Sequence, residues 1–191
     1  NLSYQISGFI RSKIMKNILV SILLVVACVC VSCEPTEITG VIDKVKLSKS
    51  DKEKLDAIFQ YVRATQAYDI LNKYDEMYES NEDYSYYGGH GGVAFMVKSM
   101  QELRDLAPED MEIPEIDFEQ HSLCWCVFRS GTSQTNIKSI RLIVQRGGDA
   151  ILKVRHETTS IDCMIGEHCA YGVFDIPTDA IWKITSDAKH L

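Results

Sequence analysis

Apolar residues recur every three or four positions in residues 55–77, which is the spacing of a helix with one buried face. The pattern predicts one long helix or two short helices. Ser50 and Glu53 have the spacing of a capping box and are predicted to begin the first helix. The same spacing at Ser99 and Glu102 predicts a further short helix.

Alternating apolar and polar residues follow this region and are typical of strands. The stretch that we expect to organise the sheet enters through Pro114 and continues as a long apolar run. Two later alternating runs flank Gly147 and Gly148 and predict a β-hairpin. The sequence therefore predicts an α+β fold, in which a helical segment precedes a mainly antiparallel β-sheet with one short helix. The expected strands are residues 93–97, 122–128, 140–144, 151–155, 170–176 and 181–184.

The beginning of the chain has the pattern of a secretory signal peptide. Met15 is the expected natural start, and Lys16 gives it positive charge. An apolar core follows in residues 18–27 and turns polar at Glu34. This core is too short to be predicted as a membrane span.

The cysteines that close this apolar core resemble the lipobox of bacterial lipoproteins, in which a cysteine is acylated and becomes the new N-terminus. Cys33 follows Ser32 at the polar boundary, so we predict that Cys33 carries the lipid. Cys28 has better-matching residues before it and is the alternative. An ordinary cleaved signal is a third interpretation. A chain acylated in this way has the membrane as its partner through the lipid anchor.

Four segments follow from this assignment. Residues 1–32 are a pre-sequence with a lipoprotein signal peptide, and residues 33–50 are a lipid-anchored tether. Residues 51–92 contain the helical segment and a loop rich in tyrosine and glycine. Residues 93–191 form the α+β domain.

Acidic residues outnumber basic ones, 27 to 20, which gives a net charge of −7. Three basic residues and no acidic residue lie in the first 33 positions, so the rest of the chain has 27 acidic and 17 basic residues, or −10. We therefore expect no nucleic-acid partner and no attraction to anionic membrane surfaces.

Four cysteines remain beyond the signal, and an exported chain meets conditions in which disulfides form. Cys163 and Cys169 flank a short loop and are the predicted disulfide. Cys124 and Cys126 point to one face of one strand and are expected as buried thiols, with a cross-link from one of them to the loop as the alternative. These cysteines and His168 lack the Cys-x2-Cys spacing of common zinc sites, so no metal and no cofactor is predicted.

The loop in residues 79–92 has four glycines around His90 and three neighbouring tyrosines, Tyr84, Tyr86 and Tyr87. Tyrosine offers a large contact area at a small cost in conformational entropy, so these three are the candidate binding residues. The alternative is a connector whose tyrosines pack against the body of the protein.

Sequence motifs of common enzymes do not occur: there is no Gly-x-Ser-x-Gly, no His-Glu-x-x-His and no phosphate-binding loop. We therefore predict that the protein is not an enzyme. A small hydrolase that uses acidic residues of 105–119 with a histidine is the alternative.

The order of elements in the second half resembles the PrcB-like C-terminal domain of small bacterial lipoproteins, named after a protease complex subunit. The resemblance lies in residues 95–99 before a helix, 114–118 before a strand, the strand at 139–144 with its hairpin, and a last strand that ends at Pro177. It covers about residues 93–185.

This resemblance implies a non-catalytic, membrane-tethered accessory or binding domain. We therefore expect an envelope or surface protein as the partner and the outer membrane as the location. A structural envelope protein without a specific ligand is a further alternative.

Overall fold

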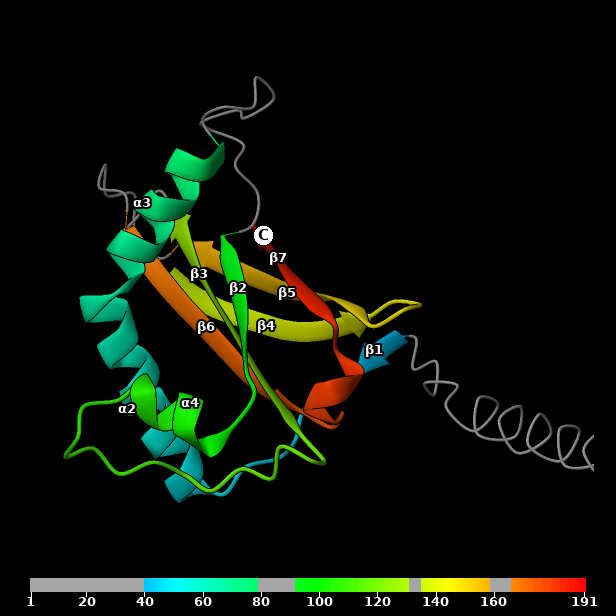
Figure 1. Cartoon of the computed structure of the whole chain (residues 1–191). Coiled ribbons are helices and arrows are strands. Elements are labelled where there is room, and N and C mark those ends of the chain that lie inside the picture. The colour runs from blue at the N-terminus through cyan, green and yellow to red at the C-terminus, as the bar shows by residue number, and fades with distance from the viewer. Residues whose placement is uncertain (1–39, 79–91, 131–134, 159–165) are drawn as a thin grey trace, which may run out of the picture. The chain divides into compact units, whose positions relative to one another are not determined.

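A computed structural model describes residues 40–78, 92–130, 135–158 and 166–191 (Figure 1). The strands form two mostly antiparallel sheets, and two helices precede every strand except the short β1, so the predicted α+β fold is confirmed. Among the described residues, no helix combines the length and apolar character needed to cross a bilayer.

The first sheet has three strands in the order β2-β3-β6, and its pairings are antiparallel. β3 (Ser122–Ser130) is the central strand and lies between β2 (Val93–Val97) and β6 (Gly166–Phe174). Almost every residue of β3 is buried, because both faces of this sheet are covered. The apolar run that we expected to organise the sheet therefore occupies its centre.

The second sheet has four strands in the order β1-β4-β5-β7. β4 (Thr135–Val144) and β5 (Asp149–Thr158) form the predicted hairpin, whose turn contains two glycines at positive φ. β1 (Gly40–Ile42) pairs antiparallel with the end of β4, and β7 (Lys183–His190) pairs with β5.

The last strand differs from the prediction in two respects. The pattern placed it at residues 181–184, but β7 begins at Lys183 and runs parallel to β5. A 3-10 helix, η1 (Thr178–Ala180), precedes β7. Ile181 follows this helix and is buried in the core, so its apolar character reflects burial and not a place in the strand. Two parallel strands require a crossover connection, which local alternation does not reveal.

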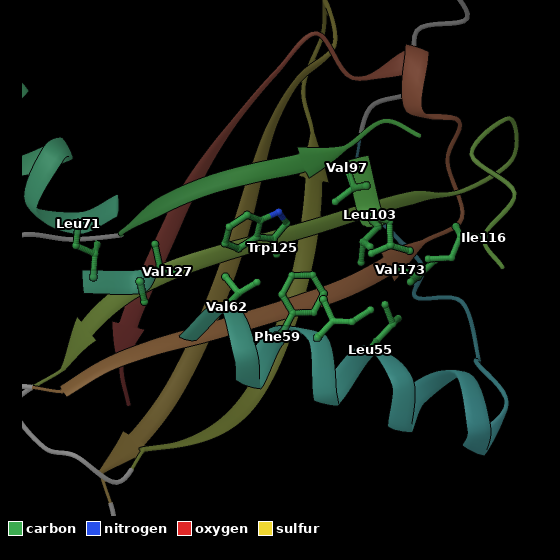
Figure 2. Close-up of a cluster of buried hydrophobic side chains, with 13 residues drawn as sticks. Leu55, Phe59, Val62, Leu71, Val97, Leu103, Ile116, Trp125, Val127 and Val173 are labelled. Atoms are coloured by element: carbon green, nitrogen blue, oxygen red, sulfur yellow. The ribbon is translucent and has the colours of Figure 1, made fainter. Parts of the chain in front are cut away.

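Two helices, α2 (Lys49–Thr65) and α3 (Ala67–Tyr78), cover one face of the three-stranded sheet. Figure 2 shows the core beneath them, where Phe59 and Val62 of α2 approach Trp125 of β3. Trp125 also stacks on Phe95 of β2, with ring centroids 4.5 Å apart. The core side chains labelled in Figure 2 are Leu55, Phe59, Val62, Leu71, Val97, Leu103, Ile116, Trp125, Val127 and Val173.

A second core fills the space between the two sheets. Alternate residues of β3 point into it, away from the helices, and meet the hairpin strands from the four-stranded sheet. The inward-facing hairpin residues that the alternation predicted are all buried. The described molecule therefore has three layers, which are helices, three-stranded sheet and four-stranded sheet. The second core includes Cys124, Cys126, Phe128, Leu142, Val144, Leu152, Val154 and Phe174.

The helix caps confirm one prediction and correct another. Ser99 caps α4 (Met100–Asp105) as predicted, since its Oγ accepts a hydrogen bond from the Glu102 amide at 3.2 Å. The cap of α2 is Ser48 rather than Ser50, because Ser48 has extended backbone angles and its Oγ accepts from the Asp51 amide at 3.1 Å.

Part of the segment predicted as a tether, residues 40–50, is described and contributes to the folded unit. β1 pairs with β4, and the Val45 amide donates to the Val173 carbonyl at 2.9 Å. The described residues belong to one compact unit that runs from Ile38 to Leu191.

Candidate functional site

An open groove of about 920 Å³ lies where α4, the loop before β3 and η1 meet. Its lining combines charged and apolar side chains from three segments that are far apart in the sequence. The lining residues are Lys98, Ser99, Met100, Ile116, Asp117, Phe118, Glu119, Thr178, Asp179 and Ile181.

Hydrogen bonds tie the loop wall of the groove to η1. The Thr178 amide donates to the Phe118 carbonyl at 3.3 Å, and the Thr178 hydroxyl donates to the His121 carbonyl at 3.1 Å. Within the loop, the Asp117 carboxylate accepts from the Glu119 amide at 3.0 Å. These bonds hold the two walls in a fixed relation, so the groove is formed before any ligand enters.

The wall at α4 is fixed by the cap. The Glu102 carboxylate accepts a hydrogen bond from the Lys98 amide at 2.7 Å, while Ser99 caps the helix. This arrangement positions Lys98 and Met100 on the groove. The local sequence dictates the turn, because a serine followed three residues later by a glutamate satisfies the amides at a helix start.

The charge of the groove is negative. Asp117, Glu119 and Asp179 provide three carboxylates at exposed positions, and Lys98 provides one positive charge among the lining residues. Phe118 and Ile181 add apolar surface. This lining suits a ligand that combines positive charge with apolar groups.

His121 follows the groove loop but is not among the residues that line the groove. Its Nδ1 is 3.5 Å from the Asp175 carboxylate and makes no hydrogen bond in the described structure. The hydrolase alternative requires a histidine that converges with the acidic loop in a pocket. That convergence does not occur in the groove.

Away from the groove, at the opposite ends of the strands, buried histidines form a cluster. His168 of β6 shares hydrogen bonds with Ser130 at 2.9 Å and Thr135 at 3.1 Å, through its Nε2. His156 of β5 stacks on Phe128, with ring centroids 5.0 Å apart. Only 8% of Ser130 and 4% of His168 is exposed, so this serine–histidine pair serves the core instead of presenting a nucleophile to solvent.

His156 should make the stability of the fold dependent on pH. Burial lowers its pKa from the ordinary value of 6.5, and the positive charges of His190, His168 and Arg155 lower it further. The unfolded chain therefore takes up the proton first, so the free energy of unfolding falls as the pH drops below 6.5. Urea unfolding at about pH 8 and about pH 5 measures the change.

His156→Gln is the matched control for this pH dependence. We expect a smaller fall in unfolding free energy between the two pH values in this variant, because it lacks the titrating ring. An identical pH dependence in both proteins would show that His156 is not responsible.

The predicted lipid and binding residues lie outside the described part of the chain. These residues are Cys33, its alternative Cys28, and the loop tyrosines Tyr84, Tyr86 and Tyr87.

One member of the predicted disulfide is described. Cys169 lies in β6 as a free thiol, while Cys163 is outside the described residues. Cys169 faces the helices, whereas Cys124 and Cys126 face the second sheet, so a bond from either of them to Cys169 is excluded. Burial raises the pKa of Cys124 and of Cys126 to about 12, which keeps both as protonated, buried thiols, as predicted.

A zinc site built from the cysteines and His168 does not form in the described structure. His168 and Cys169 are consecutive in β6 and therefore point to opposite faces of the sheet. Among the described residues, no three His, Cys, Asp or Glu side chains are grouped to hold a metal ion.

Sequence reasoning named two groove residues and missed the others. Asp117 and Glu119 were part of the acidic stretch that it considered. Lys98 and Asp179 join them only through the fold. The cap at Ser99 was the only sequence signal for the position of Lys98. No local pattern relates Lys98 to Asp179.

The structure is that of an α+β protein with two packed sheets and an open groove lined mainly by acidic and apolar residues. No family model matches the chain, and neither a curated protein nor a solved structure matches it.

Proposed function

We propose that the protein is a lipid-anchored envelope lipoprotein whose folded unit binds another envelope or surface protein without catalysing a reaction. The preformed groove is the observation that carries this proposal. It offers charge and apolar surface for recognition, while its lining includes no histidine, cysteine or pair of buried carboxylates for chemistry. The anchor is Cys33, with Cys28 as the alternative, and the location is the outer membrane.

The partner segment that fits the groove carries a basic side chain next to apolar ones. Asp117 and Asp179 would pair with the basic group, and Phe118 and Met100 would contact its apolar neighbours. Such complementarity favours the correct partner over acidic segments, because like charges brought together lose binding energy.

The proposal includes a PrcB-like assignment for residues 93–191. Its support is the order of β2, α4, β3 and the β4–β5 hairpin, which is the order that carries the sequence resemblance. This assignment adds an accessory role at the membrane and specifies no particular partner.

Co-purification from gently solubilised membranes tests the proposed function. The tagged wild-type protein should enrich a stoichiometric partner, and a variant with Asp117→Asn and Asp179→Asn should lose most of it. Both asparagines keep a hydrogen-bond acceptor, so the groove should retain its shape. Removal of two complementary charges from a binding groove should weaken association at least tenfold, or by about 1.4 kcal/mol.

The matched control changes Glu109 to Gln and Asp110 to Asn, which removes the same charge from exposed positions outside the groove lining. It should bind like the wild type. A partner that stays with the groove variant would place recognition elsewhere. Only abundant envelope proteins, recovered equally from all variants, would favour a structural protein without a specific ligand.

A further inference from the structure

Trp182 is a large apolar side chain in an unusual position, since 85% of it is exposed. It follows η1 and directly precedes β7. Its backbone is held in place, because its amide donates a hydrogen bond to the Gly148 carbonyl at 2.9 Å. The fold therefore fixes the backbone that carries this exposed indole ring.

The strand register puts Trp182 at the end of the four-stranded sheet where the described chain begins. Gly40 of β1 pairs with Val144, just before the hairpin turn, and Lys183 pairs with Asp149, just after that turn. Val41 of β1 is also exposed, to 61%. Figure 1 shows β1 and the start of β7 at this end of the sheet.

The length of chain before β1 limits how far this end of the sheet lies from the anchor, and this step rests on the lipid anchor of the proposed function. Only residues 34–39 separate Cys33 from Gly40. Even a fully extended chain of this length spans at most about 25 Å. An acylated Cys33 would therefore hold this end of the sheet within reach of the bilayer surface.

The charges around Trp182 permit contact with neutral lipid. Lys183 and Arg146 are exposed at this end of the sheet, and so are Asp149 and Asp179. These four charges cancel, and zwitterionic headgroups carry no net charge that would repel the acidic chain. Tryptophan is suited to this depth, because its ring is apolar and its indole N–H still finds hydrogen-bond partners.

We propose that Trp182, assisted by Val41, lies in the headgroup region of the membrane that holds the lipid anchor. This second contact fixes the orientation of the folded unit on the membrane. Ile181 lines the groove and is the neighbour of Trp182, so the groove then opens close to the membrane surface. A partner that reaches it must itself be present at that surface.

Tryptophan fluorescence tests this contact, since the chain has two tryptophans and Trp125 is buried. The full-length acylated protein with Trp125→Phe is placed in vesicles of phosphatidylethanolamine and phosphatidylcholine that is brominated in its acyl chains. Trp182 should show blue-shifted emission, quenching by the bromine atoms and protection from iodide. Trp182→Phe in the otherwise native chain gives the same information by difference if Trp125→Phe does not fold.

Flotation of the same vesicles separates this inference from the proposed function. If the protein floats and Trp182 is accessible to iodide and unquenched, the membrane contact is wrong and the anchor stands. If the full-length protein does not float and behaves like Cys33→Ala, the anchor is wrong and the contact falls with it. Protection of Trp182 in native membranes but not in lipid vesicles would overturn the contact in favour of a protein partner.

Discussion

Trp125→Ala should lower the free energy of unfolding by about 3–5 kcal/mol. The side chain is 4% exposed and lies at the centre of the interface between α2 and the three-stranded sheet. Its ring stacks on Phe95 at 4.5 Å and lies 5.6 Å from Phe59, so truncation leaves a cavity that both helix and sheet line. Urea unfolding of the folded unit, followed by circular dichroism, gives the difference.

Trp182→Ala is the matched control, because it removes the same side chain from a position in contact with water. In the absence of membrane, it should change the unfolding free energy by no more than about 0.5 kcal/mol. If Trp125→Ala loses as little unfolding free energy as Trp182→Ala, the core beneath α2 does not depend on Trp125.

Gly92→Ala should destabilise the protein by about 3–5 kcal/mol, because an added methyl group has no room. Gly92 has a φ of +34°, and a Cβ atom there would overlap the Val127 carbonyl oxygen and approach Phe128 Cβ to 2.7 Å. Both contacts involve β3, the strand that divides the two cores, so relief requires β2 to move away from it. Thermal unfolding measures the loss.

Gly147→Ala is the control for the backbone conformation alone. Gly147 has a φ of +88°, but a Cβ atom would meet nothing within 4 Å. The cost should be only the left-handed strain, about 1–2 kcal/mol. If both glycine variants lose the same amount, contact with β3 contributes nothing at Gly92.

Local patterns were sufficient for most of the elements. The helical spacing of apolar residues, the cap at Ser99 and the hairpin glycines each report a short-range constraint, and the structure contains all three. The strand after Pro114 was also predictable, because an apolar run bounded by turns is typical of a strand. Its place in a separate sheet from the β4–β5 hairpin was not predicted. The start of α2 was misplaced by two residues, since Ser48 and Ser50 both satisfy a cap pattern and only backbone angles distinguish them.

The candidate site was predictable only in part. The acidic stretch drew attention to Asp117 and Glu119, but an acidic run alone is typical of any solvated loop. The same limit applies to the cysteines. Their number suggested cross-links. Cys126 and Cys169 lie on opposite faces of the three-stranded sheet, and this placement depends on the strand register.

The sequence by itself determined the class of fold, the order of its helices and strands, and the acidic character of the chain, because these depend on neighbours in the chain and on composition. The tertiary structure decided the parallel pairing of β7 with β5, the groove that joins Lys98 to Asp179, and the exposure of Trp182. Each of these depends on contacts between residues far apart in the chain. A tryptophan in a sequence carries no sign of whether such contacts will cover it.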